Sequence, residues 1–83
     1  MVTKEVVLKD FSKLDASPAA MLVQMASKFE SSIYVDQEEK RTNAKSIMGV
    51  MILKFFEGEK VTVTADGADE EAALAELQKF LEA

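Results

Sequence analysis

The chain contains no cysteine and no histidine. Without cysteine it can form neither a disulfide nor a thiolate metal site, and without histidine it lacks the commonest neutral metal ligand. The spacing of oxygen ligands that calcium loops require is also absent. We therefore expect no metal and no cofactor, and folding must depend on packing alone.

Basic residues are the minority, since 10 Lys and Arg stand against 15 Asp and Glu and give a net charge of −5. Counterion release on a nucleic-acid backbone needs clustered Lys and Arg, so the composition argues against nucleic acid as a partner. Long apolar runs are missing too, because Lys4, Glu5 and Lys9 interrupt the N-terminal segment. We expect no signal sequence, no membrane span and a cytoplasmic protein without membrane binding.

Catalytic motifs are likewise absent. The sequence has no Gly-rich phosphate loop and no nucleophile paired with a base. The acidic residues Asp36, Glu38 and Glu39 lie beside Lys40 and Arg41, a pattern typical of a solvated turn. We therefore expect a protein that is not an enzyme.

The apolar residues that are present suffice for one domain over residues 1–83. Hydrophobic residues make up 48% of the chain and charged residues 30%, as in ordinary soluble globular proteins. A domain of this size buries only about 60% of the surface that its unfolded chain exposes. The chain is therefore too short to form a second core.

Apolar periodicity predicts seven elements in the order β-α-β-β-α-β-α. The expected strands cover residues 2–8, 32–35, 41–44 and 61–65. The expected helices run from Pro18 to about Phe29, over residues 46–53, and from residue 70 to Leu81. Ser17 and Asp69 are expected as N-caps of the first and last helix. The pattern predicts an α+β domain whose amphipathic helices pack against an antiparallel sheet.

One segment is specific enough to indicate a family. Residues 43–51, Asn-Ala-Lys-Ser-Ile-Met-Gly-Val-Met, are similar to the regulatory-serine segment of HPr proteins, phosphocarriers of the sugar phosphotransferase system in Gram-positive bacteria. Further matches follow in the right order at residues 18–19, 22–24, 26–29 and 65–70. The resemblance covers nearly the whole chain. It implies the HPr-like open-faced β-sandwich, a four-stranded antiparallel sheet with three helices on one face.

The loop before the first helix departs from this family. HPr proteins have G-[IL]-H-A-R-P-A there, and the histidine carries a phosphate between enzyme I and the sugar permeases. Residues 13–19 of this chain read Lys-Leu-Asp-Ala-Ser-Pro-Ala, so Asp15 stands at the histidine position and Ser17 at the arginine position. We expect histidine phosphotransfer to be lost. A carboxylate can form an acyl phosphate, but we prefer to interpret Asp15 as a favourable charge near the start of a helix.

Ser46, by contrast, keeps the family pattern. The resemblance implies phosphorylation of this serine by a dedicated kinase, after which the product binds a catabolite-control transcription factor as corepressor. A phosphate on Ser46 would lie at the start of the predicted helix over residues 46–53. The alternative is that Ser46 acts only as an N-cap. Both roles are compatible.

A third group of residues predicts an apolar docking face on the first two helices. Met21 and Met25 are one helical turn apart and off the core stripe, so we expect both at the surface. Phe55 and Phe56 are adjacent, so at least one should be exposed. The predicted partner-binding residues are Ala20, Met21, Gln24, Met25, Ile47, Met48, Met51, Ile52, Phe55 and Phe56. Alternatively, one Phe closes the core and the methionines are ordinary surface variation.

Two hypotheses follow for the function. In the first, the chain is a non-catalytic protein-binding module, an engineered HPr scaffold whose docking face has been rebuilt as a new interface with Asp15 and Ser17 at its polar rim. In the second, it is a natural HPr paralogue that regulates carbon catabolite repression through Ser46. The partner is a protein in both cases. The sequence does not decide whether the chain also associates with itself through the apolar face.

Overall fold

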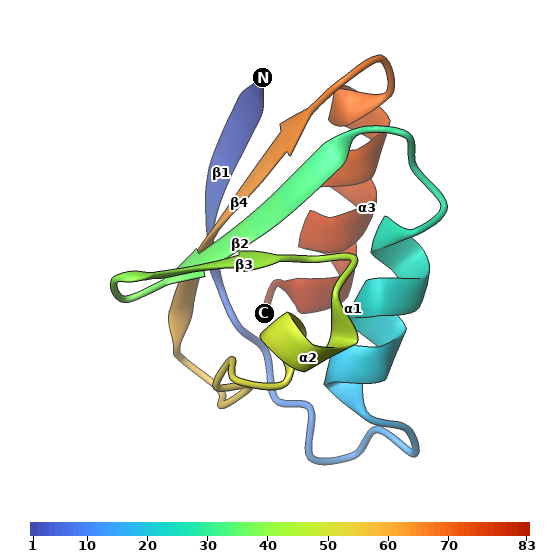
Figure 1. Cartoon of the computed structure of the whole chain (residues 1–83). Helices are drawn as coiled ribbons and strands as arrows, with labels where there is room; N and C mark the ends of the chain where they lie inside the picture. The colour runs from blue at the N-terminus through green and yellow to red at the C-terminus, as the bar shows by residue number, and fades with distance from the viewer.

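Four strands and three helices alternate along the chain in the predicted order (Figure 1). The computed structural model describes residues 1–83. The strands are β1 (Val2–Val7), β2 (Ser32–Gln37), β3 (Lys40–Asn43) and β4 (Lys60–Asp66). The helices are α1 (Pro18–Ala26), α2 (Ile47–Val50) and α3 (Glu70–Leu81).

The strands form one antiparallel sheet in the order β1-β4-β2-β3. Alternation within each strand sends one set of side chains toward the helices. Neighbouring apolar residues are therefore paired across the sheet: Val6 lies opposite Val61, Val35 opposite Val63, and Ile33 opposite Ala65. All of these side chains are buried.

The helices cover one face of this sheet, and the other face is open to solvent (Figure 1). α1 and α3 pack against each other, and the much shorter α2 packs against α1 and β3. Leu22 of α1 and Leu77 of α3 are fully buried between helices and sheet. The predicted α+β fold with three helices on one face is confirmed.

Helix α1 begins where the sequence predicts. The Ser17 hydroxyl accepts a hydrogen bond from the Ala20 amide at 3.3 Å, and Pro18 occupies the first helical position, where its missing N–H costs nothing. The helix ends at Ala26, earlier than the predicted end near Phe29. The chain continues in a turn in which the Phe29 amide donates to the carbonyl of Ala26.

Helix α2 is shorter than the predicted helix over residues 46–53. Ser46 is its N-cap and accepts from the Gly49 amide at 3.4 Å. After Val50 the backbone tightens into a turn, because the amide of Leu53 bonds to the carbonyl of Val50 three residues back. This turn directs Leu53 into the core, while Ile52 stays outside.

An aromatic cluster closes the end of the core near this turn. Phe11 contacts Phe55 edge to face at 5.8 Å between ring centroids, and it contacts Phe80 at 5.5 Å. The ammonium of Lys9 lies 5.7 Å from the Phe11 ring and 5.5 Å from the Phe80 ring. Phe11 lies between the first predicted strand and the first predicted helix, so the predicted elements gave no sign that it belongs to the core. The Phe11 and Phe80 side chains are both buried.

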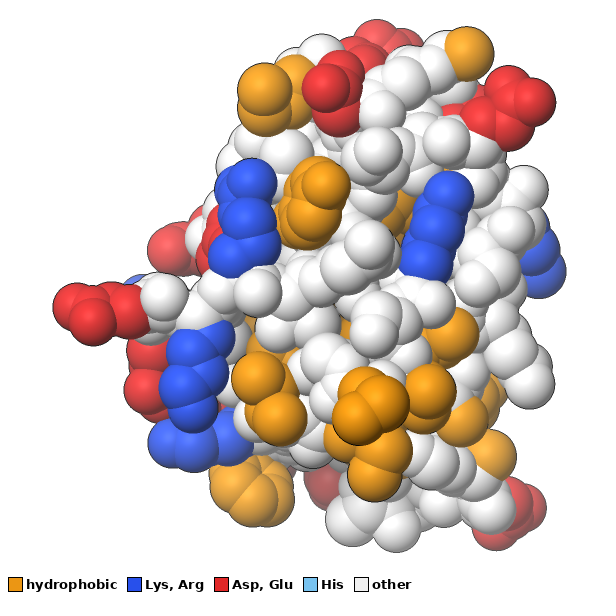
Figure 2. Space-filling model, in the orientation of Figure 1, with side chains coloured by type: hydrophobic (Ala, Val, Ile, Leu, Met, Phe, Trp, Pro, Cys, Tyr) orange, Lys and Arg blue, Asp and Glu red, His pale blue; other side chains and the backbone are white.

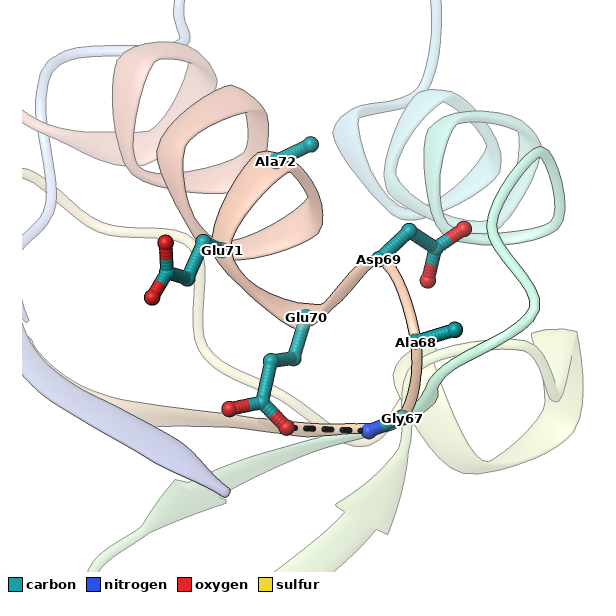
Figure 3. Close-up of a pocket in the computed structure, with 6 residues that line it drawn as sticks. All are labelled: Gly67, Ala68, Asp69, Glu70, Glu71 and Ala72. Carbon is teal, nitrogen blue, oxygen red and sulfur yellow. Dashed lines mark hydrogen bonds between the residues drawn. The ribbon is translucent and has the colours of Figure 1, made fainter.

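Asp69 holds the N-cap position of α3, but its carboxylate does not cap the helix. It accepts instead from the backbone amides of Glu30 and Ser31, each at 2.9 Å, and from the Ser31 hydroxyl. Glu70 accepts from the Gly67 amide at 3.1 Å (Figure 3). Gly67 has no room for a side chain, since a Cβ there would lie 2.7 Å from the Cα of Ser31. Asp69 therefore ties the α1–β2 loop to the β4–α3 loop.

Loss of the Asp69 hydrogen bonds to the α1–β2 loop should change how the stability of the protein depends on pH. The Ser31 hydroxyl, followed by the Glu30 amide, lowers the pKa of Asp69. A lowered folded-state pKa contributes stability above the unfolded-state pKa of about 3.9, and this contribution disappears as the pH falls through the folded-state value. We expect Asp69→Asn to melt several degrees below wild type at neutral pH, and we expect the difference to shrink on acidification.

Thermal melts from neutral to acidic pH measure this effect. Glu71→Gln is the matched control, because Glu71 lies in the same first turn of α3 and is exposed without a hydrogen-bond partner. An offset between Asp69→Asn and wild type that stayed constant with pH would refute a role for the Asp69 charge.

Candidate functional site

Asp15 lies in the exposed loop that precedes α1. Ala16 and Ser17 beside it are exposed as well, and no hydrogen bond or ion pair holds the Asp15 carboxylate. The Ser17 hydroxyl is engaged in capping α1. The loop therefore presents a carboxylate with no cation paired to it, which is a poor arrangement for holding a phosphoryl group.

Ser46 is exposed at the start of α2. Its hydroxyl oxygen accepts the Gly49 amide, which leaves its own proton and its outward side accessible. Lys45 points the other way, and its ammonium donates to the carbonyl of Phe29 at 2.7 Å. A Cβ on Gly49 would lie 3.1 Å from Thr42, so α2 is seated closely against β3. The Ser46 hydroxyl is thus accessible and lies on a helix that is packed closely against the sheet.

An apolar patch surrounds the end of α2. Figure 2 shows orange side chains gathered on the lower half of the viewed face, below the sheet hairpin. The exposed fractions of the large apolar side chains in residues 47–56 are 42% for Ile47, 81% for Met48, 68% for Met51, 56% for Ile52 and 68% for Phe56. We call these five residues the α2 patch. Large exposed apolar groups clustered in this way are typical of a binding surface.

The predicted docking face is only partly correct. Met21 and Met25 are half-buried and pack against the core, as is Phe55, whose ring lies on Phe11. The physical reason is that α1 packs against both α2 and α3, so helix contacts cover surface of α1 that sequence spacing alone leaves free. Ala20 is half-buried, and Gln24 is exposed. The exposed surface is therefore centred on α2 and the segment after it.

Phe55 and Phe56 have opposite environments, as their adjacency in the sequence predicts. Phe55 turns inward to the aromatic cluster, while Phe56 is exposed. The expectation that at least one of the two rings reaches the surface is confirmed. The alternative that one Phe closes the end of the core is also correct, for Phe55.

Gln37 supports the backbone at Lys54, which lies between Ile52 and Phe56 of the α2 patch. The sequence did not indicate this role of Gln37. We predicted Gln37 in a polar turn, yet it ends β2 with its side chain buried. Its amide nitrogen donates to the carbonyl of Lys54 at 2.9 Å, and its amide oxygen accepts from the Lys54 backbone at 2.8 Å. The ammonium of Lys54 also pairs with Glu38 at 3.2 Å. The position of Gln37, two residues after the inward-facing Val35, was the signal for its burial.

Charge is unevenly distributed around the α2 patch. Figure 2 shows Lys and Arg side chains flanking the orange patch on this face, whereas acidic side chains gather toward its margins. The whole chain is nonetheless acidic, with a net charge of −5. The viewed face thus carries charged side chains of both signs around the apolar patch.

The only pocket lies elsewhere, at the start of α3 (Figure 3). It is lined by residues 67–72, where Asp69 binds the α1–β2 loop, Glu70 binds Gly67, and Glu71 is exposed without a hydrogen-bond partner. No group of three or more acidic side chains is arranged to hold a metal ion. No helix has the length and apolar character needed to cross a membrane.

The four-stranded antiparallel sheet with three helices on one face is the fold of small phosphocarrier domains. Comparison with protein families identifies the particular family to which this domain belongs. The family described as "PTS HPr component phosphorylation site" matches residues 2–83, and the chain belongs to this HPr family. Its members are phosphocarrier proteins, not enzymes.

Individual relatives agree with this assignment. The HPr-like protein Crh of Halalkalibacterium halodurans is 43% identical over 82 residues, which cover 99% of this chain and 98% of that protein. The crystal structure of the phosphocarrier protein HPr from Bacillus anthracis is 40% identical, with a TM-score of 0.88 over 98% of this chain and 96% of that one. Bacillus subtilis Crh, described as a catabolite repression protein, was solved as a domain-swapped dimer; it is 40% identical, with a TM-score of 0.71 over 90% of this chain and 82% of that one.

Proposed function

We propose that this chain is a regulatory member of the HPr family that acts in the cytoplasm by binding other proteins. In this proposal, Ser46 accepts a phosphate from a protein kinase, and the modified chain binds a transcription factor that controls carbon catabolite repression. The observation that carries the proposal is the accessible Ser46 hydroxyl next to the exposed α2 patch. Histidine phosphotransfer is lost, because Asp15 and Ser17 occupy the positions of the family's histidine and arginine.

The relatives favour a natural regulatory paralogue over an engineered scaffold. An HPr-like protein matches 99% of this chain at 43% identity, and a second protein of that name is described as a catabolite repression protein. The exposed apolar residues Ile47, Met48 and Met51 belong to the same segment as Ser46, so one regulatory surface accounts for both features. A redesigned interface is then not needed to explain the α2 patch.

Phosphorylation would change the charge of this face more than its shape. A phosphate adds about −1.5 to −2 charge at pH 7 and three strong acceptor oxygens. The Lys45 ammonium is held by the Phe29 carbonyl on the far side of the segment, so it is not preorganised to neutralise that charge. The fitting partner therefore offers Arg or Lys for the phosphate and an apolar surface for Met48 and Met51.

The test is phosphorylation of the purified chain by an HPr kinase with ATP, followed by intact mass spectrometry. We expect addition of one phosphoryl group, complete loss of it in Ser46→Ala, and normal addition in Ser27→Ala, an exposed serine at the end of α1. Binding of the phosphorylated chain to a catabolite-control transcription factor is then measured by calorimetry. Failure of the kinase to modify Ser46 would overturn the proposed function.

A point change in the α2 patch should separate binding from folding. Phe56 is largely exposed, so Phe56→Ser is expected to change the free energy of unfolding by no more than about 0.5 kcal/mol. If Phe56 is an interface anchor, the same change weakens binding of the transcription factor by about 2 kcal/mol, or roughly 30-fold. Calorimetry on the phosphorylated variants and thermal melts measure the two effects. Binding that Phe56→Ser leaves intact would remove Phe56 from the docking surface.

A second copy of the chain is the other partner that this face offers. Bacillus subtilis Crh was solved as a domain-swapped dimer. Light scattering on wild type and on Phe56→Ser tests the idea. A dimer that dissociates in the variant would support pairing through the α2 patch, and a dimer unaffected by it would exclude that patch as the interface.

A further inference from the structure

Two of the five sulfur atoms of this protein lie on the proposed docking surface. The chain has five methionines and no cysteine. Met48 and Met51 belong to the α2 patch and are largely exposed, whereas Met21 and Met25 are half-buried against the core. The two accessible methionines of this surface are three residues apart, and Met48 is only two residues from Ser46.

The thioether groups are therefore the only sulfur chemistry available to an oxidant. The lone pair of the thioether sulfur attacks one oxygen of a peroxide, and that oxygen atom is transferred to the sulfur. The O–O bond breaks, sulfur loses two electrons and becomes a sulfoxide, and the second peroxide oxygen leaves as water. Enzymes that use thiols as reductant reverse the change. Exposure controls the rate, so Met48 and Met51 should react before Met21 and Met25.

From this arrangement we infer that Met48 and Met51 form an oxidative modification site at which peroxide disables the docking surface without unfolding the protein. The inference rests on the proposed function, since it assigns a second mode of control to the surface around Ser46. Oxidation converts a flexible apolar side chain into a polar one. Both side chains already face solvent, so the folded chain tolerates the new oxygen, whereas a partner must bury it.

The order of oxidation is the first test. The chain is treated with hydrogen peroxide in stages, quenched and digested, and sulfoxide is quantified at each methionine by mass spectrometry. Met48 and Met51 should be oxidised several-fold faster than Met21 and Met25, and circular dichroism should show an unchanged fold at that stage. Met1 is exposed but far from Ser46 in the fold, so it should react as well and serves as a second reference. Equal rates at the exposed and half-buried methionines would overturn the inference.

The second test asks whether oxidation matters for docking. The initial rate of Ser46 phosphorylation by an HPr kinase is measured before and after mild peroxide treatment, and the ratio is compared between wild type and Met48→Leu/Met51→Leu. We expect the phosphorylation rate of wild type to fall about fivefold or more after treatment. The reason is that the interface must then bury a sulfoxide oxygen that has no hydrogen-bond partner. The double leucine variant should keep its own untreated rate after treatment, although its Met1 is still oxidised.

The outcomes of the two proposals remain distinguishable. If untreated wild type is not phosphorylated, the proposed function fails, whereas the oxidation order still reports on the modification site. If treated wild type is phosphorylated at the untreated rate, the modification does not control docking and the inference is wrong. An equal loss in the leucine variant also overturns it, because another residue would then be responsible. Restoration of the wild-type rate by a methionine sulfoxide reductase with a thiol would support the inference.

Discussion

Replacing Phe11 with alanine is expected to lower the free energy of unfolding by about 3–5 kcal/mol. The Phe11 ring is buried between Phe55 and Phe80, with centroid distances of 5.8 Å and 5.5 Å. Its removal opens a cavity, deletes two aromatic contacts and removes one of the two rings that the Lys9 ammonium faces. Small domains have a total stability of only about 5–15 kcal/mol, so this single change could leave much of the protein unfolded at 37 °C.

Urea-induced unfolding followed by circular dichroism measures this loss. Phe56→Ala is the matched control, because it removes the same side chain from an exposed position and should cost little. If Phe11→Ala cost no more than Phe56→Ala, the aromatic cluster would not be part of the core. Phe55→Ala should lie between the two, since the Phe55 ring is half-buried.

The second large effect is a gain of function. We expect Asp15→His combined with Ser17→Arg to make the chain a substrate of enzyme I of the phosphotransferase system, whereas wild type accepts no phosphoryl group from it. Histidine is nucleophilic at neutral pH because its pKa lies near 6.5, and the planar guanidinium of arginine can hold a phosphoryl group through paired hydrogen bonds. The exposed loop around Asp15 can accommodate both side chains.

This double change should lower the stability of the fold only slightly. Ser17→Arg removes the hydrogen bond from the Ala20 amide that caps α1, which is worth about 1 kcal/mol. Intact mass spectrometry after incubation with phosphorylated enzyme I measures the transfer, and Asp15→His alone shows how much the arginine adds. Phosphorylation of the wild-type chain at Asp15 would contradict the loss of carrier activity that we infer from its loop.

Most of the architecture follows from local patterns in the sequence. Alternation in residues 61–65 and the apolar stripe of residues 73–81 are strong enough to identify β4 and α3. The Ser17-Pro18 pair sets the start of α1, because each residue satisfies a specific requirement of a helix N-terminus. Element ends were less predictable, since the stops after Ala26 and Val50 depend on the turns that tertiary packing requires.

Contacts between distant segments account for the errors. Asp69 was correctly expected before α3, but its preferred hydrogen-bond donors are the amides of Glu30 and Ser31, about 39 residues away in the sequence. Local rules predict capping and cannot detect such competition. Gln37 was misjudged for the same reason, because its partner is the backbone of Lys54.

In the candidate site, too, local features were predictable from the sequence and features that depend on tertiary packing were not. Ser46 was identified from its own segment, and its exposure agrees with that prediction. The extent of the apolar face required knowledge of how the helices pack, because Met21 and Met25 are half-buried against the core whereas Met48 and Met51 are exposed. Helical periodicity defines which side chains share one face of a helix, but it does not reveal which neighbour covers that face.

The position of β4 constrains when this protein can fold during its synthesis. β4 is an inner strand that pairs with β1 on one side and β2 on the other, yet it is the last strand in the sequence. Thr3 of β1 contacts Thr64 of β4 across 61 residues of chain. A growing chain on the ribosome therefore holds an unpaired first strand and an isolated β2–β3 hairpin until residues 60–66 emerge. Folding is consequently a late, nearly all-or-none event that follows most of translation.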